Sequence, residues 1–200
     1  KSYNPESRQW RSYALTGIIS DGFDDNGYGE LVIGNDNSKW IGSNSHGVIG
    51  FNESNGNPQI KSLKGEDENM PNDHVTALAI DKRNQLWIGT SRGLRVLYNT
   101  SAFFTDDNVR AEEIIILEDG IAKELLFQQI ISSIQVDGSN NKWIGTIGAG
   151  LFYLSSDGQK TIYHFTKQNS PLPSDNVVDL SIDENSGVVY IASENGLVSF

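Results

Sequence analysis

The three histidines are the side chains of this sequence best suited to acid–base catalysis or metal binding near neutral pH. They are His46, His74 and His164, and their separations fit no metal-ligand spacing. We expect one in a hairpin turn, one in a connector and one in an outer strand, so they would not converge on a single point. No metal site and no cofactor is predicted from them.

Three aspartates, Asp81, Asp137 and Asp183, each follow a short alternating apolar run. An active site needs different groups that converge on one point, whereas one group copied into successive units is typical of a turn cap. We therefore predict no catalytic residue and no enzymatic activity.

Two segments resemble known ligand loops but lack the required spacing. Residues 21–27 are rich in aspartate, yet no carboxylate stands where the closing Glu of a helical calcium loop belongs. Residues 155–158 are similar to the Asp box of sialidase propellers, but the glycine comes one place early and no Trp follows Thr161. We predict a connector for the first segment and a hairpin turn for the second.

A unit that occurs four times must position all of these residues. Its anchor is clearest at Trp143-Ile144-Gly145, recurs at Trp40 and Trp87, and returns more weakly at Tyr190. The interval of roughly 50 residues fits either a four-stranded propeller blade or an all-helical repeat.

Composition favours strands over helices. Each anchor is a short β-branched and aromatic run that ends in a turn with glycine and is followed by a second apolar run. Alternating apolar pairs precede the anchors: Leu31 and Ile33, Leu78 and Ile80, Ile134 and Val136, Leu180 and Ile182. The predicted fold class is all-β, a β-propeller made of four-stranded antiparallel blades, with about four blades present as part of a larger propeller.

The predicted organisation is an N-terminal strand at residues 8–16, without a hairpin partner, followed by four blades. The blades span about 28–64, 75–117, 130–166 and 177–200, with outer strands at Gln59–Lys64, Glu113–Leu117 and Thr161–Thr166. The fourth blade has no outer strand, and about nine extra residues lengthen the second. The lone first strand and the incomplete last blade either close a ring together or belong to neighbouring blades of a longer chain. We expect a fragment of a longer protein.

The aromatic anchors could serve as sugar-stacking platforms, but their regular recurrence predicts that they fill the core between neighbouring sheets. A second recurring apolar position lies about five residues before each inner strand. Its occupants are Phe23, Met70, Leu126 and Leu172.

Composition excludes several classes of partner. The formal net charge of -11 and the pI near 4.6 argue against nucleic acid, which requires clustered Lys and Arg. No apolar run approaches membrane-spanning length and no basic amphipathic run suggests a membrane surface, so we predict no direct membrane insertion. The absence of cysteine excludes disulfides and thiolate metal sites.

Ligand binding is predicted on the face where the inner strands begin, because the connectors and the turns after the anchor strands share that side. Amides and carboxylates there suit hydroxyl-rich ligands, and they suit solvent equally well. The connector candidates are Asp25, Asn26, Asn72, Asp73, His74, Gln128, Gln129, Asp175 and Asn176, and the turn candidates are Asn44, His46, Arg92 and Glu194.

Residues 75–81, 86–90 and 93–94 resemble the two-component regulator propeller repeat family, which occurs in ectodomains of bacterial hybrid sensor kinases. Residues 138–146, 163–176 and 196–200 are similar to PorZ-like propellers of the Bacteroidetes type IX secretion system. The resemblance covers about four repeats. It implies a ring with more blades than this chain encodes, no enzymatic role, and an extracytoplasmic location in the periplasm or at the outer-membrane surface.

Three functions from different classes fit this reading. The first is a recognition or assembly propeller of type IX secretion that handles surface polysaccharide or protein partners, as the resemblance implies. The second is a periplasmic glycan-sensing ectodomain of a hybrid two-component histidine kinase. The third and most distant is a propeller hydrolase or lyase. Exposed faces on the terminal blades would also favour self-association.

Overall fold

The computed structural model describes residues 1–15, 17–19, 27–53, 57–118 and 120–200. Within these residues the regular structure consists of antiparallel strands and two short 3-10 helices, η2 (Glu66–Glu68) and η3 (Ala102–Phe104). None of the described helices has the length and apolar character needed to cross a membrane. The predicted all-β class is therefore confirmed.

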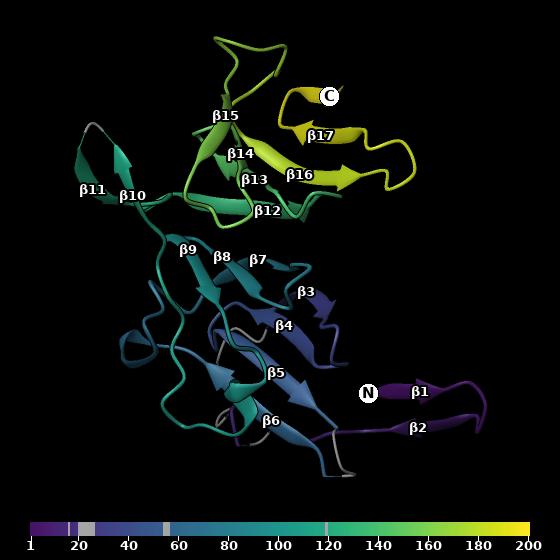
Figure 1. Ribbon diagram of the computed structural model, residues 1–200. Coiled ribbons are helices and arrows are strands. Elements are labelled where there is room, and N and C mark those ends of the chain that lie inside the picture. The colour runs from purple at the N-terminus through teal and green to yellow at the C-terminus, as the bar shows by residue number, and fades with distance from the viewer. Residues whose placement is uncertain (16, 20–26, 54–56, 119) are drawn as a thin grey trace.

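Four antiparallel sheets follow one another along the chain, and each is built in the order of its strands (Figure 1). We call them blades 1 to 4. Blade 1 contains β3 (Tyr28–Ile33), β4 (Lys39–Ser43), β5 (Val48–Asn52) and β6 (Gln59–Leu63). Blade 2 contains β7 (Val75–Ile80), β8 (Leu86–Thr90) and β9 (Gly93–Leu97).

The last two blades repeat this pattern. Blade 3 contains β12 (Ile130–Val136), β13 (Lys142–Ile147), β14 (Leu151–Leu154) and β15 (Thr161–Phe165). Blade 4 contains β16 (Val177–Ile182), β17 (Val189–Ser193) and β18 (Gly196–Ser199). The first strands are neighbours in order, β3 beside β7, β7 beside β12 and β12 beside β16. This is the arrangement expected of sheets that radiate from one axis.

Two sequence predictions about the strands are wrong. The strand expected at residues 8–16 covers only β2 (Gln9–Arg11), and it does have a hairpin partner, β1 (Ser2–Asn4). The outer strand expected for blade 2 at Glu113–Leu117 does not form. Instead β10 (Ile115–Glu118) pairs with β11 (Ile121–Glu124) in a hairpin that projects from the blades in Figure 1.

The β10–β11 hairpin forms because the two runs are separated by a short turn. Gly120 in that turn has φ of 76°, a conformation that glycine adopts without strain. Pairing across so short a loop fixes fewer residues than pairing β10 with β9 would. On the edge of β9 that faces away from β8, the described residues form one isolated bridge, between Val96 and Glu112.

The predicted packing role of the three tryptophans is confirmed. Trp40 and Trp87 have 0% of their surface exposed and Trp143 has 4%. Each packs against aliphatic side chains of the next blade, and we call these contacts seams 1 to 3. Seam 1 joins Trp40 to Leu78 and Ile88, seam 2 joins Trp87 to Ile134 and Ile144, and seam 3 joins Trp143 to Leu180 and Ile191.

The glycine that follows each Trp-Ile pair allows the next blade to approach closely. A Cβ atom at Gly89 would lie 2.5 Å from Ile131, and one at Gly145 would lie 2.7 Å from Val177. Such distances are too short for any larger side chain, so the glycine is required by the seam. The predicted close approach of the sheets is confirmed.

The second recurring apolar position is buried as well. Met70, Leu126 and Leu172 have exposed fractions of 2%, 7% and 5%. Phe23, the fourth predicted occupant, lies outside the described residues.

The recurring aspartates cap turns, as predicted. Oδ1 of Asp81 accepts hydrogen bonds from the backbone N–H groups of Arg83 and Gln85. Asp137 binds the corresponding N–H groups of Ser139 and Asn141 in the same way. Residues 155–158 likewise form the expected hairpin turn, in which the Gly158 N–H donates to the Ser155 carbonyl.

We expect Trp87→Ala to lower the free energy of unfolding by about 3–5 kcal/mol, because it leaves a large cavity in seam 2. Tyr190→Ala is the matched control, since Tyr190 holds the equivalent place in blade 4 and is 44% exposed. Urea unfolding followed by circular dichroism measures both. Equal losses for the two variants would contradict the assignment of the indole to the seam.

Candidate functional site

The connectors between blades and the turns after the second strands meet at one edge of the molecule. The N–H of Gly47 donates to the carbonyl of Asp73, and the N–H of Ser91 donates to the carbonyl of His74. In blades 3 and 4 the N–H of Gly148 donates to the carbonyl of Asp175. We call this edge the connector face, and it holds the described residues that the sequence proposes for ligand binding.

A hydroxyl closes the turn in every blade at this face. The side-chain oxygens of four equivalent residues donate to the carbonyl of the glycine that opens the third strand, over 2.8 to 3.0 Å. The sequence shows the Ser or Thr at each place but does not reveal this role. The four residues are Ser43, Thr90, Thr146 and Ser193.

Two of the predicted ligand residues hold the blade edges together. The carboxylate of Asp73 accepts from the N–H of Gly65 at 2.7 Å, just after the outer strand of blade 1. Asp175 does the same with the N–H of Lys167 at 2.8 Å, just after the outer strand of blade 3. Both carboxylates are therefore used within the scaffold.

Two predicted amide side chains also bind neighbouring turns. The Nδ2 group of Asn72 donates to Oγ of Ser91 at 2.6 Å, and that of Asn176 donates to Oε2 of Glu194 at 2.7 Å. Glu194, a predicted turn candidate, is exposed but carries this bond. These two amides therefore stabilise the neighbouring turns.

Three predicted side chains remain exposed and gather around the turn of blade 2. His74 and Arg92 flank Ser91, whose N–H binds the His74 carbonyl. A Cβ at Gly93 of the same turn would lie 3.7 Å from the backbone N of Gln128. We call His74, Arg92 and Gln128 the blade 2 rim group. Imidazole, guanidinium and amide groups together offer hydrogen-bond donors and positive charge.

The other candidates are placed differently. Gln129 is partly buried and its N–H donates to the Leu126 carbonyl. Asn44 and His46 lie in the β4–β5 turn, where His46 is only 4% exposed. Asp25 and Asn26 lie outside the described residues.

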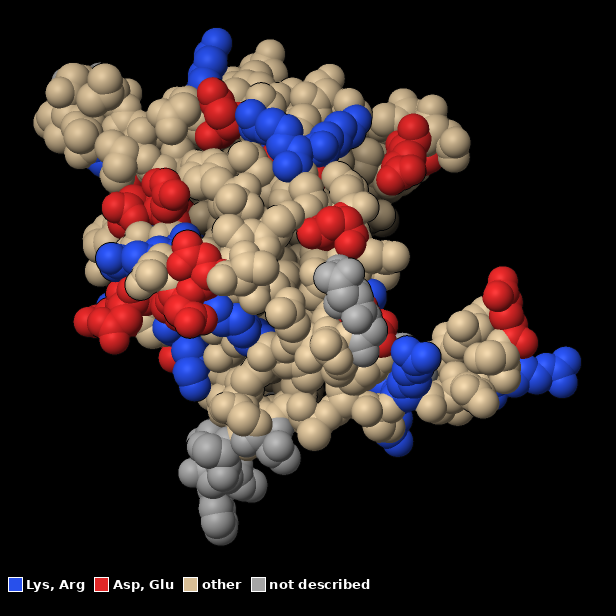
Figure 2. Space-filling view, turned by 60° about the horizontal axis from the view of Figure 1, so that its bottom comes forward, with Lys and Arg blue, Asp and Glu red and all other residues tan. Residues whose placement is uncertain are grey.

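The three histidines lie in the predicted contexts, which are the β4–β5 turn, the connector before β7 and the outer strand β15. His164 stacks on Phe152 with ring centroids 4.0 Å apart, and its Nε2 lies 2.6 Å from the Ala149 carbonyl oxygen. Among the described residues, no group of three or more His, Asp or Glu side chains is placed to hold a metal ion. In the view of Figure 2, acidic and basic side chains are interspersed, without a continuous basic tract.

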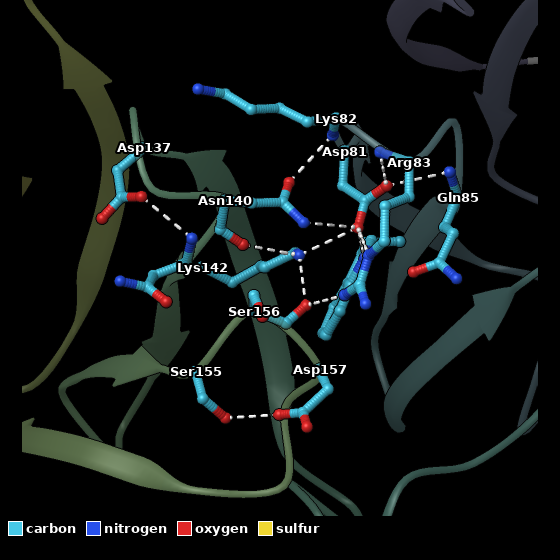
Figure 3. Close-up of polar contacts among 12 residues, drawn as sticks. Asp81, Lys82, Arg83, Gln85, Asp137, Asn140, Lys142, Ser155, Ser156 and Asp157 are labelled. Carbon is cyan, nitrogen blue, oxygen red and sulfur yellow. Dashed lines mark hydrogen bonds and ion pairs between the residues drawn. The ribbon is translucent and has the colours of Figure 1, made fainter.

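Sequence reasoning missed a buried ion pair in seam 2. The ammonium of Lys142 lies 2.9 Å from Oδ2 of Asp81, and both side chains have no exposed surface. Figure 3 shows this ammonium directed from blade 3 toward the turn of blade 2. It also donates to the carbonyls of Asn140 and Ser156, and it lies 4.5 Å from the centre of the Trp87 ring. All three of its protons therefore have acceptors.

The environment keeps the Asp81 carboxylate ionised. Burial alone would raise its pKa, but hydrogen bonds from the Gln85 N–H and from Lys142, with the charge of Lys142, hold the pKa of Asp81 below its ordinary value. Residue types alone do not single out this pair, because the residue before the anchor is a lysine in the first and third repeats, Lys39 and Lys142, and apolar in the other two.

A second, largely buried ion pair holds the β10–β11 hairpin against blade 2. Nη1 of Arg95, on β9, lies 2.5 Å from Oε1 of Glu124 at the end of β11. The Arg95 side chain is 7% exposed, and its Nε donates to the Asn69 carbonyl. This contact fastens the hairpin to blade 2, where an outer strand would otherwise lie.

Two carboxylates of the inner strands lie close enough to repel each other. Glu30 on β3 and Asp179 on β16 occupy equivalent places in blades 1 and 4. Desolvation and repulsion from Asp179 raise the pKa of Glu30, despite a hydrogen bond from the Leu78 N–H. Asp179 accepts a hydrogen bond from Ser133 at 3.0 Å. Electrostatic repulsion therefore acts between a residue of blade 1 and a residue of blade 4.

Comparison with known proteins agrees with this geometry. Residues 69–92, which include β7 and β8, match the model of the family described as two component regulator propeller. The chain carries a two-component regulator propeller repeat. Among curated proteins, no sequence gave a significant match.

Solved structures give the fold. PorZ, an essential bacterial surface component of the type IX secretion system of Porphyromonas gingivalis, is 26% identical over 99% of this chain, with a TM-score of 0.85. Extracellular domains of the B. thetaiotaomicron one-component system BT4673 and hybrid two-component system BT3049 are 18% and 23% identical over 96% and 89% of the chain, with TM-scores of 0.69 and 0.65. This chain spans 28%, 26% and 21% of those three chains. The predicted β-propeller is confirmed.

We expect Lys142→Met to lower the free energy of unfolding by about 3–5 kcal/mol, because it removes the buried partner of the Asp81 carboxylate and leaves it the more distant, half-exposed Arg83, whose Nε lies 3.7 Å away. Asp81→Asn keeps the oxygen that caps the turn, and the double variant should lose less than the two single losses combined. Urea unfolding measures the cycle. Lys123→Met, which removes an exposed pair with Glu118, is the control and should change stability far less. Strict additivity at Lys142 and Asp81 would refute the coupling.

We expect Glu30→Gln to stabilise the protein at neutral pH. The raised pKa of Glu30 means that its ionised form disfavours the folded state. The benefit should therefore shrink as the pH falls through the folded-state pKa of Glu30, and vanish once the carboxyl is protonated in both states. Thermal melting across this pH range measures the difference. Glu118→Gln is the control, because its hydrogen bond to Lys123 lowers the pKa of Glu118 and removes the expected gain. A pH-independent effect at Glu30 would count against repulsion from Asp179.

Proposed function

We propose that this chain is part of a larger, non-catalytic extracytoplasmic propeller that works in recognition and assembly in the manner of PorZ, and that it binds anionic surface polysaccharide at the blade 2 rim group. The observation that carries the proposal is the gathering of exposed His74, Arg92 and Gln128 where connectors and turns meet. The likeness to PorZ over 99% of the chain supports the assembly role. The extracellular domains among the similar structures support the location.

Exposed seam residues support a ring with further blades. Leu31 on the first blade is 59% exposed, whereas its equivalents Leu78 and Ile134 are each 1% exposed within seams. On the last blade Leu197 is 68% exposed, whereas Leu94 and Leu151 at the same place are each 1% exposed. The free faces of blades 1 and 4 therefore expose apolar residues of the kind that the seams bury. Further blades of the same type can pack against these two faces.

The charge of the rim group supports an anionic, hydroxyl-rich ligand. The chain carries a net charge of -11, so an exposed guanidinium at Arg92 in the turn that binds the His74 backbone stands out from the overall charge. Arginine binds carboxylate and phosphate groups through paired hydrogen bonds, and an amide such as that of Gln128 can bind hydroxyl groups.

We expect this chain to bind purified lipopolysaccharide that carries an anionic polysaccharide, and to release no cleavage product. The double variant His74→Ala/Arg92→Ala should weaken binding at least about tenfold, because it removes the charge-assisted hydrogen bonds. Glu184→Ala, an exposed change in the β16–β17 turn, is the control. Biolayer interferometry measures affinity, and chromatography of the polysaccharide detects cleavage. Undiminished binding by the double variant would exclude the rim group, and turnover would exclude a non-catalytic role.

A sensor ectodomain is the second candidate, and the matches to BT3049 and BT4673 favour it. Both candidates require the same propeller and differ in what the polypeptide carries beyond it. A membrane-spanning helix followed by a kinase domain in the parent polypeptide would decide for the sensor. A parent polypeptide with further propeller repeats but without those domains would decide for the PorZ-like role.

A further inference from the structure

The connector into blade 3 departs from the connectors into blades 2 and 4 at one residue. In the other two connectors a proline, Pro71 or Pro173, follows the recurring apolar residue, whereas Phe127 stands at that place before blade 3. Phe127 is 57% exposed. A phenylalanine ring loses free energy when it stays in water, and the repeat itself does not need one here.

The backbone is strained on both sides of Phe127. Leu126 and Gln128 have φ of 56° and 58°, a left-handed conformation that is unfavourable for a bulky side chain such as that of leucine. The residues at the same places in the other two connectors do not adopt it; they are Met70, Asn72, Leu172 and Ser174. Leu126 is 7% exposed, so this backbone buries one apolar side chain and leaves the next one in solvent. Strain of this kind is found where function requires the geometry.

Phe127 lies beside the turn of blade 2 that carries Arg92. A Cβ atom on Gly93 would lie 3.5 Å from the carbonyl oxygen of Leu126 and 3.7 Å from the backbone N of Gln128. Phe127 is the residue between these two, and Arg92 directly precedes the glycine. An exposed aromatic ring therefore adjoins the blade 2 rim group.

Two isoleucines make the same edge of blade 3 apolar. Ile130 and Ile147 are cross-strand neighbours at the ends of β12 and β13, and they are 41% and 38% exposed. Blades 2 and 4 carry polar residues at both places. These are His74 and Ser91 in blade 2, and Asn176 and Glu194 in blade 4. The connector face is thus apolar at blade 3 and cationic at the adjoining turn of blade 2.

We infer that Phe127 is the stacking platform of the polysaccharide site, where its ring lies against the apolar face of a pyranose while Arg92 holds an anionic group of the same glycan. The inference rests on the proposed function and adds the chemistry of the ligand, which is a polysaccharide that carries its anionic group close to a sugar with an unbroken C–H face. The face of an aromatic ring is electron-rich and attracts such C–H groups. The amide of Gln128 can bind the hydroxyl groups at the rim of the sugar.

The small size of the apolar area favours a sugar over a protein surface. A stable protein interface buries about 800 Å² on each partner, which is more than three half-exposed side chains provide. One or two sugar rings need much less. The polar groups beside the ring, from His74, Arg92 and Gln128, match the few orienting contacts that a small ligand unit requires.

Biolayer interferometry with polysaccharide released from an anionic lipopolysaccharide tests the platform. Phe127→Ala should weaken binding about fivefold, and Phe127→Leu nearly as much, because stacking needs a flat aromatic face. Phe127→Trp should keep the affinity. Added salt should leave the loss from Phe127→Ala unchanged but reduce the loss from Arg92→Ala, since only the charged contact is screened.

Tyr163→Ala is the matched control, because Tyr163 is 56% exposed in the middle of the outer strand of blade 3. It should leave the affinity unchanged, and thermal melting reports whether each variant is folded. Binding that needs Arg92 but not Phe127 would overturn the platform and leave the proposed function standing. Full binding by Phe127→Leu would also overturn it, because any apolar contact, such as one made by a protein, would then suffice. Failure of the unchanged protein to bind the polysaccharide would refute the proposed function itself, and the platform with it.

Discussion

The contact between one indole and the aliphatic face of the next sheet is the interaction on which this structure depends. Backbone hydrogen bonds join strands within a blade, but the described blades are joined chiefly through side chains. An isolated three- or four-stranded sheet cannot bury both of its apolar faces. Trp40, Trp87 and Trp143 supply the largest side chains at these contacts, and the glycine two residues after each lets the next inner strand approach. The order of the blades follows from repeating this one contact.

The repeated contact does not by itself determine which blades become neighbours. The tryptophan of each blade packs on aliphatic side chains of the same kind in all three seams. The features that differ between seams supply that information. Seam 1 is closed by Phe103 and Phe104, and seam 2 contains the buried pair of Lys142 and Asp81. A buried pair adds little net stability over apolar residues of similar size, but it strongly disfavours any neighbour that lacks the partner. The Lys142 pair therefore acts chiefly on the specificity of assembly.

The sequence predicts what is repeated and misses what occurs once. The strands, the buried tryptophans, the seam glycines and the capping aspartates recur in register, so each copy supports the assignment of the others. The β10–β11 hairpin and the pair of Arg95 with Glu124 occur in one blade only, and an isoleucine-rich run such as that at 114–116 can pair with more than one partner. Interactions between residues far apart in sequence, such as the repulsion between Glu30 and Asp179, depend on how the blades are arranged in space, which local patterns do not encode.

The same distinction bears on function. Carboxylates and amides on the connector face look suited to a ligand, but those at equivalent places, such as Asp73 and Asp175, make the same scaffold bonds in different blades. A side chain that every blade needs for its own edge is poorly placed to distinguish one ligand from another. His74 and Arg92 have no counterpart of the same type in the fourth repeat, where Asn176 and Asn195 take their places. Specific recognition on a repeating scaffold must come from such departures, and for that reason we propose the blade 2 rim group, and not the repeated carboxylates, as the ligand site of this face.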